Sequence, residues 1–168
     1  IFHFPTGRTD MSEYTRLLTD KGDLGSTRLE TGPVPQAGPG EIVLKLDRFS
    51  LTTNNITYAA FGDAMQYWHF FPTGQEGWGH MPVWGFADIV ASGIPGLEAG
   101  ERFYGYFPIA SHVVMKPERI SERGFYDGAE HRQALVSAYN QYTRCSADTV
   151  YAPEREAFQA LYRPLFIT

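Results

Sequence analysis

The stretch from residue 82 to residue 116 constrains the fold more than any other part of the chain. It contains three short runs rich in aromatic and β-branched residues, at 82–92, 102–106 and 111–116. Turns rich in Gly, Pro and charged residues separate these runs. Such runs, with turn formers between them, are typical of antiparallel strands. We therefore predict three successive antiparallel strands in the half-buried wall of a barrel or sandwich.

The same stretch resembles the GroES-like domain of the medium-chain dehydrogenases/reductases. In that family a loop commonly reads apolar residue, two or three variable residues and Gly-Asp-Arg-Val, with a Gly soon after. Residues 97–105 read Leu-Glu-Ala-Gly-Glu-Arg-Phe-Tyr-Gly, with Glu101 in place of the Asp. More narrowly, residues 54–58, 67–72 and 139–142 are similar to an uncharacterised, quinone oxidoreductase-like branch, the domain of unknown function 2855 type. The resemblance covers residues 14 to 168.

This resemblance implies a mostly β, GroES-like, partly open β-barrel with a helical C-terminal extension. Residues 1–13 are a lead-in, residues 14–120 form the barrel, and residues 121–168 form the helical extension. In the resembled enzymes a Rossmann domain follows and binds NAD(P). The chain starts without an initiator Met and stops abruptly at 166–168. We therefore expect a fragment that lacks this second domain.

Two further strands and two helices are predicted. By resemblance, residues 14–18 form a strand that reaches a turn at 21–23, although this window alone does not exclude a short helix. Residues 41–49 alternate as a strand with one face in the core. The core face carries Ile42, Leu44 and Leu46, and the other face carries Val43, Lys45 and Asp47.

The helices are predicted at 127–145 and 154–162. The first has apolar residues at three- and four-residue steps, and the second has Pro153 at its first position.

The Asn-rich segment from Asn54 to Gly62 is the first candidate site. In the resembled family, a turn containing Asn enters a short helix beside the substrate cleft. One interpretation assigns substrate binding to Asn54 and Asn55 and places Tyr58 in the cleft, with an exposed hydroxyl that binds or protonates substrate. The alternative is that the two Asn residues only cap the helix and that Tyr58 packs.

The aromatic segment 66–72 is the second candidate site. Its aromatic surface must be buried under a lid, in a pocket or at a subunit contact. The resemblance assigns Tyr67, Trp68 and Phe70, together with Trp84, to the wall of the substrate cleft. A small core beneath a long loop is the plain alternative. An aromatic loop at 65–72 that docks a partner is another.

Zinc is not expected. A catalytic zinc needs about three N, S or O ligands from the protein, and zinc-dependent relatives supply a Cys and a His-Glu pair. Residues 82–84 read Pro-Val-Trp where those relatives have Gly-His-Glu, and the only cysteine, Cys145, lies far along the chain. We interpret the remaining candidates as polar wall or surface residues: His69, His80 and His112.

Two other catalytic motifs are weak. Ser111 and His112 invite a hydrolase interpretation, but adjacent strand residues point to opposite faces, so we expect them not to share a site. The turn at 93–96 has the wrong glycine spacing for a dinucleotide phosphate, no helix follows it, and Pro95 removes an N–H group.

Charge and composition exclude several kinds of partner. The net charge of −5 argues against a surface for nucleic acid or an anionic membrane, since these need clustered Lys and Arg. No run of ~18 apolar residues indicates a membrane span, and the N-terminal residues lack the features of a signal peptide. Cys145 cannot form an intrachain disulfide and is compatible with a reducing compartment. We therefore expect a cytoplasmic location.

These observations lead to one expected function and one alternative. The chain is expected to be the substrate-side domain of a zinc-independent NAD(P)-dependent oxidoreductase, with NADP bound mainly by the missing domain. Hydride would pass to a carbonyl or conjugated double bond of a small-molecule substrate, with Tyr58 as the proton donor. Without its second domain, an apolar face from residues 67–71 and the last helix would be exposed and favour self-association into homo-oligomers. The alternative is a non-catalytic binding or interaction domain.

Overall fold

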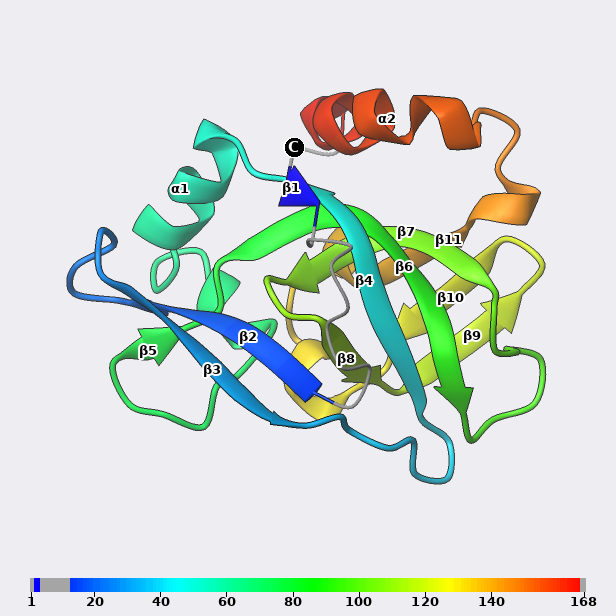
Figure 1. Cartoon of the computed structure of the whole chain (residues 1–168), viewed down its shortest axis with the longest axis horizontal. Coiled ribbons are helices and arrows are strands. Elements are labelled where there is room, and N and C mark those ends of the chain that lie inside the picture. Colours follow the sequence, from blue (N-terminus) through cyan, green and yellow to red (C-terminus); the bar gives the residue numbers. More distant parts are fainter. Residues whose placement is uncertain (1, 4–12, 167–168) are drawn as a thin grey trace.

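A strongly curved sheet dominates the computed structural model, which describes residues 2–3 and 13–166 (Figure 1). Its path runs β1-β4-β6-β7-β11-β10-β9, and β8 pairs with β4 off this path. All of these pairings are antiparallel. The strands are β1 (Phe2–His3), β4 (Ile42–Ser50), β6 (Pro82–Ser92), β7 (Arg102–Pro108), β8 (His112–Met115), β9 (Pro117–Ser121), β10 (Gly124–Asp127) and β11 (Gln141–Arg144).

A second, smaller sheet lies against the first. Its order is β3-β2-β5, formed by β2 (Glu13–Asp20), β3 (Thr27–Pro33) and β5 (Trp78–Gly79). The backbone N–H of Leu17 donates to the carbonyl of Ile109, and that of Ser111 donates to Thr15. These bonds tie β2 to the segment between β7 and β8.

The predicted mostly β, partly open barrel with a C-terminal helix is confirmed. The strands predicted at 14–18, at 41–49 and within 82–116 are all present. The third run of 82–116 differs in its pairing, because β8 bonds to β4 rather than to β7. After Pro108 the chain bends at 109–111 and crosses to the part of β4 that β1 leaves unpaired. This crossing curls the sheet.

The two faces of strand β4 are not divided into an apolar and a polar face as the sequence pattern predicts. Ile42, Leu44 and Leu46 are buried as predicted, but Val43 is also fully buried. The register with β6 shifts between Val43 and Leu44, which is the mark of a β-bulge. The strict alternation that the sequence pattern assumes therefore stops at that point.

The predicted helix at 127–145 is wrong. Residue 127 ends β10, and residues 141–144 form β11, with only short 3₁₀ turns η2 (Glu130–Arg132) and η3 (Ser137–Asn140) between them. The ring of Tyr142 packs over Gly105, where an added Cβ would lie 2.3 Å from the Tyr142 Cδ1 atom. Its hydroxyl donates to the carbonyl of Tyr106 at 2.6 Å. Pairing with β7 and β10 thus makes residues 141–144 a strand rather than part of a helix. The barrel wall therefore extends to residue 144.

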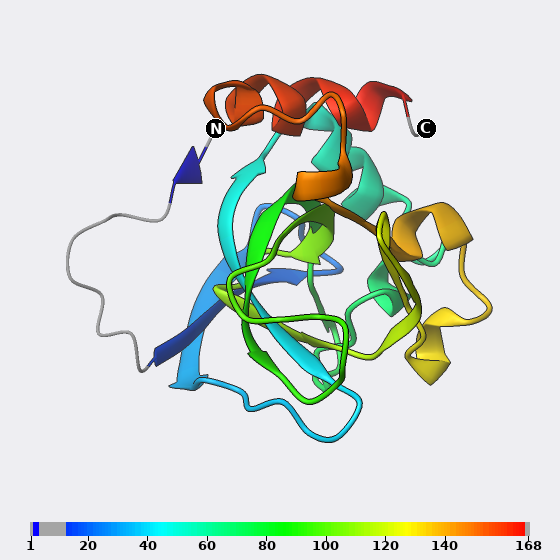
Figure 2. The ribbon, with the colours of Figure 1, turned by 90° about the vertical axis from the view of Figure 1, so that its right-hand side faces the viewer.

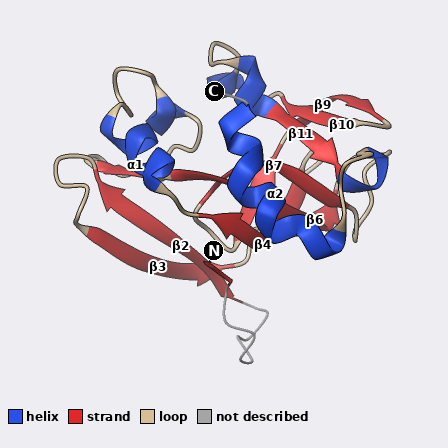
Figure 3. Ribbon diagram, turned by 90° about the horizontal axis from the view of Figure 1, so that it is seen from above, coloured by secondary structure: helices blue, strands red, loops and turns tan. Residues whose placement is uncertain are grey.

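Two short α-helices lie at one end of the barrel, α1 (Thr53–Ala60) and α2 (Glu156–Tyr162) (Figures 1 and 3). Helix α2 follows the 3₁₀ turn η5 (Pro153–Arg155), begins two residues after its predicted start and crosses the ends of β4 and β6 (Figure 2). The 3₁₀ turns η1 (Tyr67–His69), η4 (Cys145–Ala147) and η6 (Arg163–Phe166) complete the elements. In the described residues, no helix has the length and apolar character needed to cross a membrane.

Candidate functional site

The start of α1 positions the first candidate residues. Thr52 is the N-cap: its backbone N–H donates to Asn55 Oδ1 at 2.6 Å, and its hydroxyl accepts from the backbone N–H of Asn54 at 3.3 Å. The Asn55 side chain also donates to the carbonyl of Pro82 at 2.9 Å. Asn55 is thus a buried cap that fastens α1 to β6, as the capping alternative describes.

Tyr58 lies inside the molecule. The expectation of an exposed hydroxyl is wrong, because the side chain is only 1% exposed. Asn54 Nδ2 donates to the Tyr58 hydroxyl oxygen at 3.0 Å, and Trp84 Nε1 donates to it at 3.2 Å. Since both partners donate, neither of them uses the Tyr58 proton, and the Tyr139 hydroxyl is a further hydrogen-bonding neighbour of Tyr58. Burial raises the pKa of Tyr58, so the hydroxyl stays protonated at neutral pH.

Three more tyrosines surround Tyr58, and we call the four residues Tyr58, Tyr67, Tyr106 and Tyr139 the tyrosine cluster. The ring centroids of Tyr58 lie 4.8 Å from Tyr67 and 5.5 Å from Tyr106, and Tyr106 lies 4.7 Å from Tyr139. The Tyr67 and Tyr139 hydroxyls are 3.4 Å apart. The Tyr106 hydroxyl is buried without a hydrogen-bond partner in the described residues. The cluster therefore places phenol hydroxyls in aromatic surroundings.

Phe70 and Trp84 pack against this cluster. Phe70 lies 5.4 Å from Tyr106 and 5.4 Å from Tyr139, and Trp84 lies 5.1 Å from Tyr106, all between ring centroids. The fold thus brings Asn54, Tyr58, Tyr67, Phe70 and Trp84 together, and their predicted functional roles stay predictions. The sequence interpretation missed Tyr106 and Tyr139. The similarity of residues 139–142 to the resembled branch was the one signal that could have found Tyr139.

Trp68 lies apart from the tyrosine cluster. Its indole fills the space between two glycines: an added Cβ on Gly62 would lie 2.0 Å from Nε1, and one on Gly79 would lie 2.4 Å from Cε3. Lys21 Nζ lies 5.9 Å from its ring centroid. Trp68 therefore holds the loop 61–79 together by packing.

The aromatic segment forms part of the main core. Tyr67, Trp68, Phe70 and Phe71 are each at most 9% exposed. The expectation that residues 67–71 contribute to an exposed apolar face is therefore wrong for these four side chains. Helix α2 and the turn after it do expose large apolar side chains, namely Phe158, Tyr162 and Leu165. Self-association stays a prediction that rests on this last segment.

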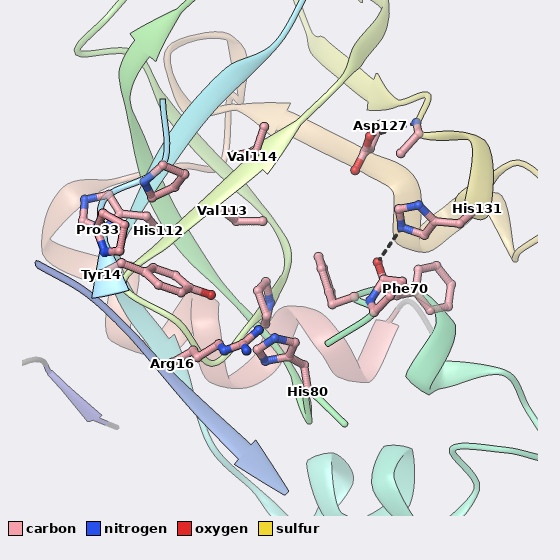
Figure 4. Close-up of a pocket in the computed structure, with 15 residues that line it drawn as sticks. Tyr14, Arg16, Pro33, Phe70, His80, His112, Val113, Val114, Asp127 and His131 are labelled. Carbon is pink, nitrogen blue, oxygen red and sulfur yellow. Dashed lines mark hydrogen bonds between the residues drawn. The ribbon is translucent and has the colours of Figure 1, made fainter. Parts of the chain in front are cut away.

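A cavity of about 380 Å³ lies between β2, β8 and residues 70–72 (Figure 4). Its polar lining comes from Tyr14, Arg16, His80, His112, Asp127 and His131. Of the predicted site residues, Phe70 lines it, and its carbonyl lies 3.3 Å from His131 Nε2. Phe70 thus stands between this cavity and the tyrosine cluster.

The expectation for Ser111 and His112 is wrong, because Ser111 Oγ lies 2.9 Å from His112 Nδ1. Ser111 sits in the bend before β8, so the alternation of strand side chains does not apply to it. Its Oγ also accepts from the backbone N–H of Thr15 at 2.9 Å, which gives this hydroxyl a structural role. Burial and then the charge of Lys45 lower the pKa of His112.

The histidines occupy wall and surface positions, as predicted. His80 and His112 are buried in the cavity wall, and His69 is exposed. Across residues 2–3 and 13–166, no three His, Cys, Asp or Glu side chains are grouped so that they could hold a metal ion. The expectation that the protein needs no zinc stays a prediction.

One comparison with known proteins, a family model, supports the resemblance to the DUF2855 branch. No curated protein matches the chain. Among solved structures, the apo form of JamJ enoyl reductase is similar to it, with 13% sequence identity and a TM-score of 0.39. That similarity covers 82% of this chain and 38% of the other, so this chain spans less than half of that enzyme's length. The family model described as "Protein of unknown function (DUF2855)" matches residues 49–168. Because this match covers more than half of the chain, the protein belongs to the DUF2855 family.

Proposed function

We propose that the chain is the substrate-side domain of a zinc-independent, NADP-dependent oxidoreductase that reduces a carbonyl or a conjugated double bond. The observation that carries this proposal is the Tyr58 hydroxyl. It accepts hydrogen bonds from Asn54 and Trp84, so neither of them uses its proton, and the Tyr139 hydroxyl is a further hydrogen-bonding neighbour. In the resembled family, the corresponding segment enters a short helix beside the substrate cleft, which supports this role for Tyr58.

The proposed role of the chain's residues concerns the substrate oxygen. Hydride addition to a carbonyl carbon, or to the far carbon of a conjugated double bond, leaves negative charge on oxygen. Tyr58 donates its proton toward this oxygen, while Asn54 and Trp84 stabilise the phenolate oxygen that remains. The aromatic surroundings contain little water to compete with these bonds, which strengthens them. Asn54 is half-buried and Trp84 is only 3% exposed, so the Asn54 side of the Tyr58 hydroxyl is the less buried one.

The turn at 93–96 does not fit a dinucleotide pyrophosphate, which needs free backbone N–H groups at a glycine-rich turn. In the turn at 93–96, the Gly93 N–H already donates to the carbonyl of Glu41 at 2.7 Å. The Ile94 N–H donates to Ser92 Oγ at 3.3 Å. An added Cβ on Gly93 would lie 2.1 Å from the Gly38 carbonyl oxygen, so the turn is packed against the chain. Cofactor binding is therefore expected of a separate domain.

The test is the variant Tyr58→Phe in a protein that includes the cofactor domain. Losing a positioned proton donor lowers turnover by about 10²- to 10⁴-fold. The variant also leaves Trp84 Nε1 and Asn54 Nδ2 without a partner, which costs about 1–3 kcal/mol of unfolding free energy. Turnover is therefore measured well below the melting temperature of the variant.

Tyr104→Phe is the matched control. The Tyr104 ring stacks on Trp84 at 5.7 Å, and its hydroxyl is buried without a partner in the described residues. Removing that hydroxyl leaves no donor unpaired, so turnover stays near that of the parent protein. Equal turnover of the Tyr58→Phe and Tyr104→Phe proteins would show that Tyr58 only packs.

The alternative of an interaction domain gains no support from the aromatic segment. Docking through residues 65–72 needs exposed aromatic side chains. Tyr67, Trp68 and Phe70 instead belong to the core.

A further inference from the structure

Strand β3 is an exposed edge of the small sheet. The sheet order is β3-β2-β5, so β2 occupies one side of β3. In the part of the chain that the structure describes, no strand pairs with the other side. Figure 3 shows β3 at the rim of the molecule, with β2 on its inner side. Leu29, near the middle of β3, is 70% exposed. An edge of this kind is a template for pairing with another strand.

The backbone groups of alternate β3 residues point away from β2. In an antiparallel pair, opposite residues alternate between hydrogen-bonded and non-hydrogen-bonded pairs. The Leu17 N–H donates to the carbonyl of Ile109, which lies on the side of β2 away from β3. Leu29 is directly opposite Leu17, so the two form a non-hydrogen-bonded pair. The N–H and C=O groups of Leu29, and by alternation those of Thr27 and Thr31, therefore face the free edge.

The sequence of β3 is self-complementary about Leu29. In an antiparallel pair of two copies with Leu29 opposite the partner's Leu29, Thr27 lies opposite the partner's Thr31. All three outward-facing residues then exchange N–H···O=C bonds with the partner. Arg28 lies opposite the partner's Glu30 in the closer, non-hydrogen-bonded kind of pair, where opposite charges are favourable.

Other antiparallel registers are less favourable. Moving the two-fold axis by one residue places Arg28 opposite the partner's Arg28, or Glu30 opposite the partner's Glu30, and like charges directly opposite are destabilising. Moving it to Thr31 places Leu29 opposite the partner's Pro33, which has no N–H to donate. The charges and the proline therefore select the register centred on Leu29.

The two charged residues are already held in place by their own chain. The Arg28 guanidinium lies 4.0 Å from the Trp78 ring centroid and 3.0 Å from the Glu30 carboxylate. Glu30 also accepts from Arg16 at 2.8 Å. Because these exposed charges have partners, the new pairs select the register and add little affinity. Two short strands also bury less surface than a standard interface of about 1,600 Å². The dissociation constant is therefore expected to be on the order of 10⁻⁴ M.

We propose that β3 is a self-association edge, at which a second copy of this chain pairs antiparallel about Leu29. The two small sheets then join into one continuous sheet. This edge is separate from the exposed apolar side chains of α2, and the inference does not depend on the proposed oxidoreductase activity.

The test is sedimentation velocity of the chain at increasing concentration, with variants at position 29. Leu29→Lys and Leu29→Glu each place like charges opposite each other at the two-fold axis, so each should weaken self-association about tenfold or more. An equimolar mixture of the two variants brings opposite charges together and should regain the association of the native chain. Among antiparallel registers, only the one centred on Leu29 brings the two substituted positions together.

A control and a second measurement complete the test. Phe158→Lys, at an exposed position of α2, should leave self-association unchanged. Hydrogen exchange at the amides of Leu29 and Thr31 should slow as the concentration of the native chain rises. A native chain that stays monomeric up to about 1 mM would overturn the proposal. Position-29 variants that associate like the native chain, a mixture that does not regain association, or loss of association in Phe158→Lys would overturn it as well.

Discussion

His80 combines deep burial with a neutral imidazole. Burial removes water from the ring, and the nearby guanidinium of Arg16 opposes protonation. The pKa in the folded protein, about 4, lies below the ordinary value of 6.5 for an exposed histidine. Between these two values the unfolded chain binds a proton that the folded chain does not. Folding stability attributable to His80 is therefore complete above pH 6.5 and falls as the pH drops toward 4.

We predict that His80→Gln removes part of the acid sensitivity of the protein. At pH 4 the native histidine should cost on the order of 3 kcal/mol of stability relative to pH 7. Urea unfolding from pH 7 to pH 4 measures this as the difference between the native and variant curves, so that shared carboxylate titrations cancel. His69→Gln, at an exposed position, is the control. Parallel curves for the native and His80→Gln proteins would contradict the prediction.

Helix α2 is held to the barrel chiefly by Arg102. This guanidinium donates to Glu156 through Nε at 2.6 Å, to Asp88 through Nη1 at 2.7 Å and to Asp47 through Nη2 at 2.6 Å. Ser50 Oγ adds a bond to the carbonyl of Ala160 at 2.7 Å. The Arg of the loop motif that carries the family resemblance thus connects β4, β6 and α2.

We predict that Arg102→Met loosens α2 before it loosens the barrel. Glu156 is 5% exposed, and removing its main partner leaves a buried carboxylate beside the Tyr151 hydroxyl, at 2.7 Å, and the more distant Arg48, at 3.4 Å. The loss of unfolding free energy should be about 3 kcal/mol. Hydrogen exchange should accelerate first at the amides of residues 156–162. Arg155→Met, at an exposed position, should change stability by no more than about 0.5 kcal/mol. Unchanged exchange in α2 would contradict this role of Arg102.

Sequence patterns predicted helices and strands correctly where residues adjacent in the sequence determine the conformation. The strands within 82–116 have turn formers on both sides, so their residues alone indicate strand. The segment 127–145 shows the opposite case. Its helical spacing competes with the packing of Tyr142 over Gly105 and with the hydrogen bond from the Tyr142 hydroxyl to the carbonyl of Tyr106. Gly105 and Tyr106 lie in β7, outside this segment, so a window of sequence cannot reveal them.

At the scale of the whole molecule, barrel closure decides which side chains meet. Asn54 and Tyr58 come from α1, Trp84 from β6, Tyr106 from β7 and Tyr139 from η3. The resemblance selected most of the residues around the tyrosine cluster, because their types match a known cleft. It could not select Tyr106, since strand alternation does not say at which end of the barrel a side chain lies. The sequence interpretation also missed the cavity beside His80. Its walls come from β2 and β8, which are far apart in the sequence and approach each other only in the folded chain.

We predict, finally, that the chain of residues 1–168 does not bind NADPH measurably. In the turn at 93–96, the backbone N–H groups of Gly93 and Ile94 are not free to bind a pyrophosphate, because both are already hydrogen-bonded within the chain. Contact with the nicotinamide end alone would bury a small part of the cofactor, which is too little for micromolar affinity. Titration of the chain into NADPH, followed by cofactor fluorescence, measures this. Joining the chain to its proposed cofactor domain should restore binding. Saturable micromolar binding by residues 1–168 alone would mean that the chain holds a nucleotide site of its own, and the division of labour between two domains would then be wrong.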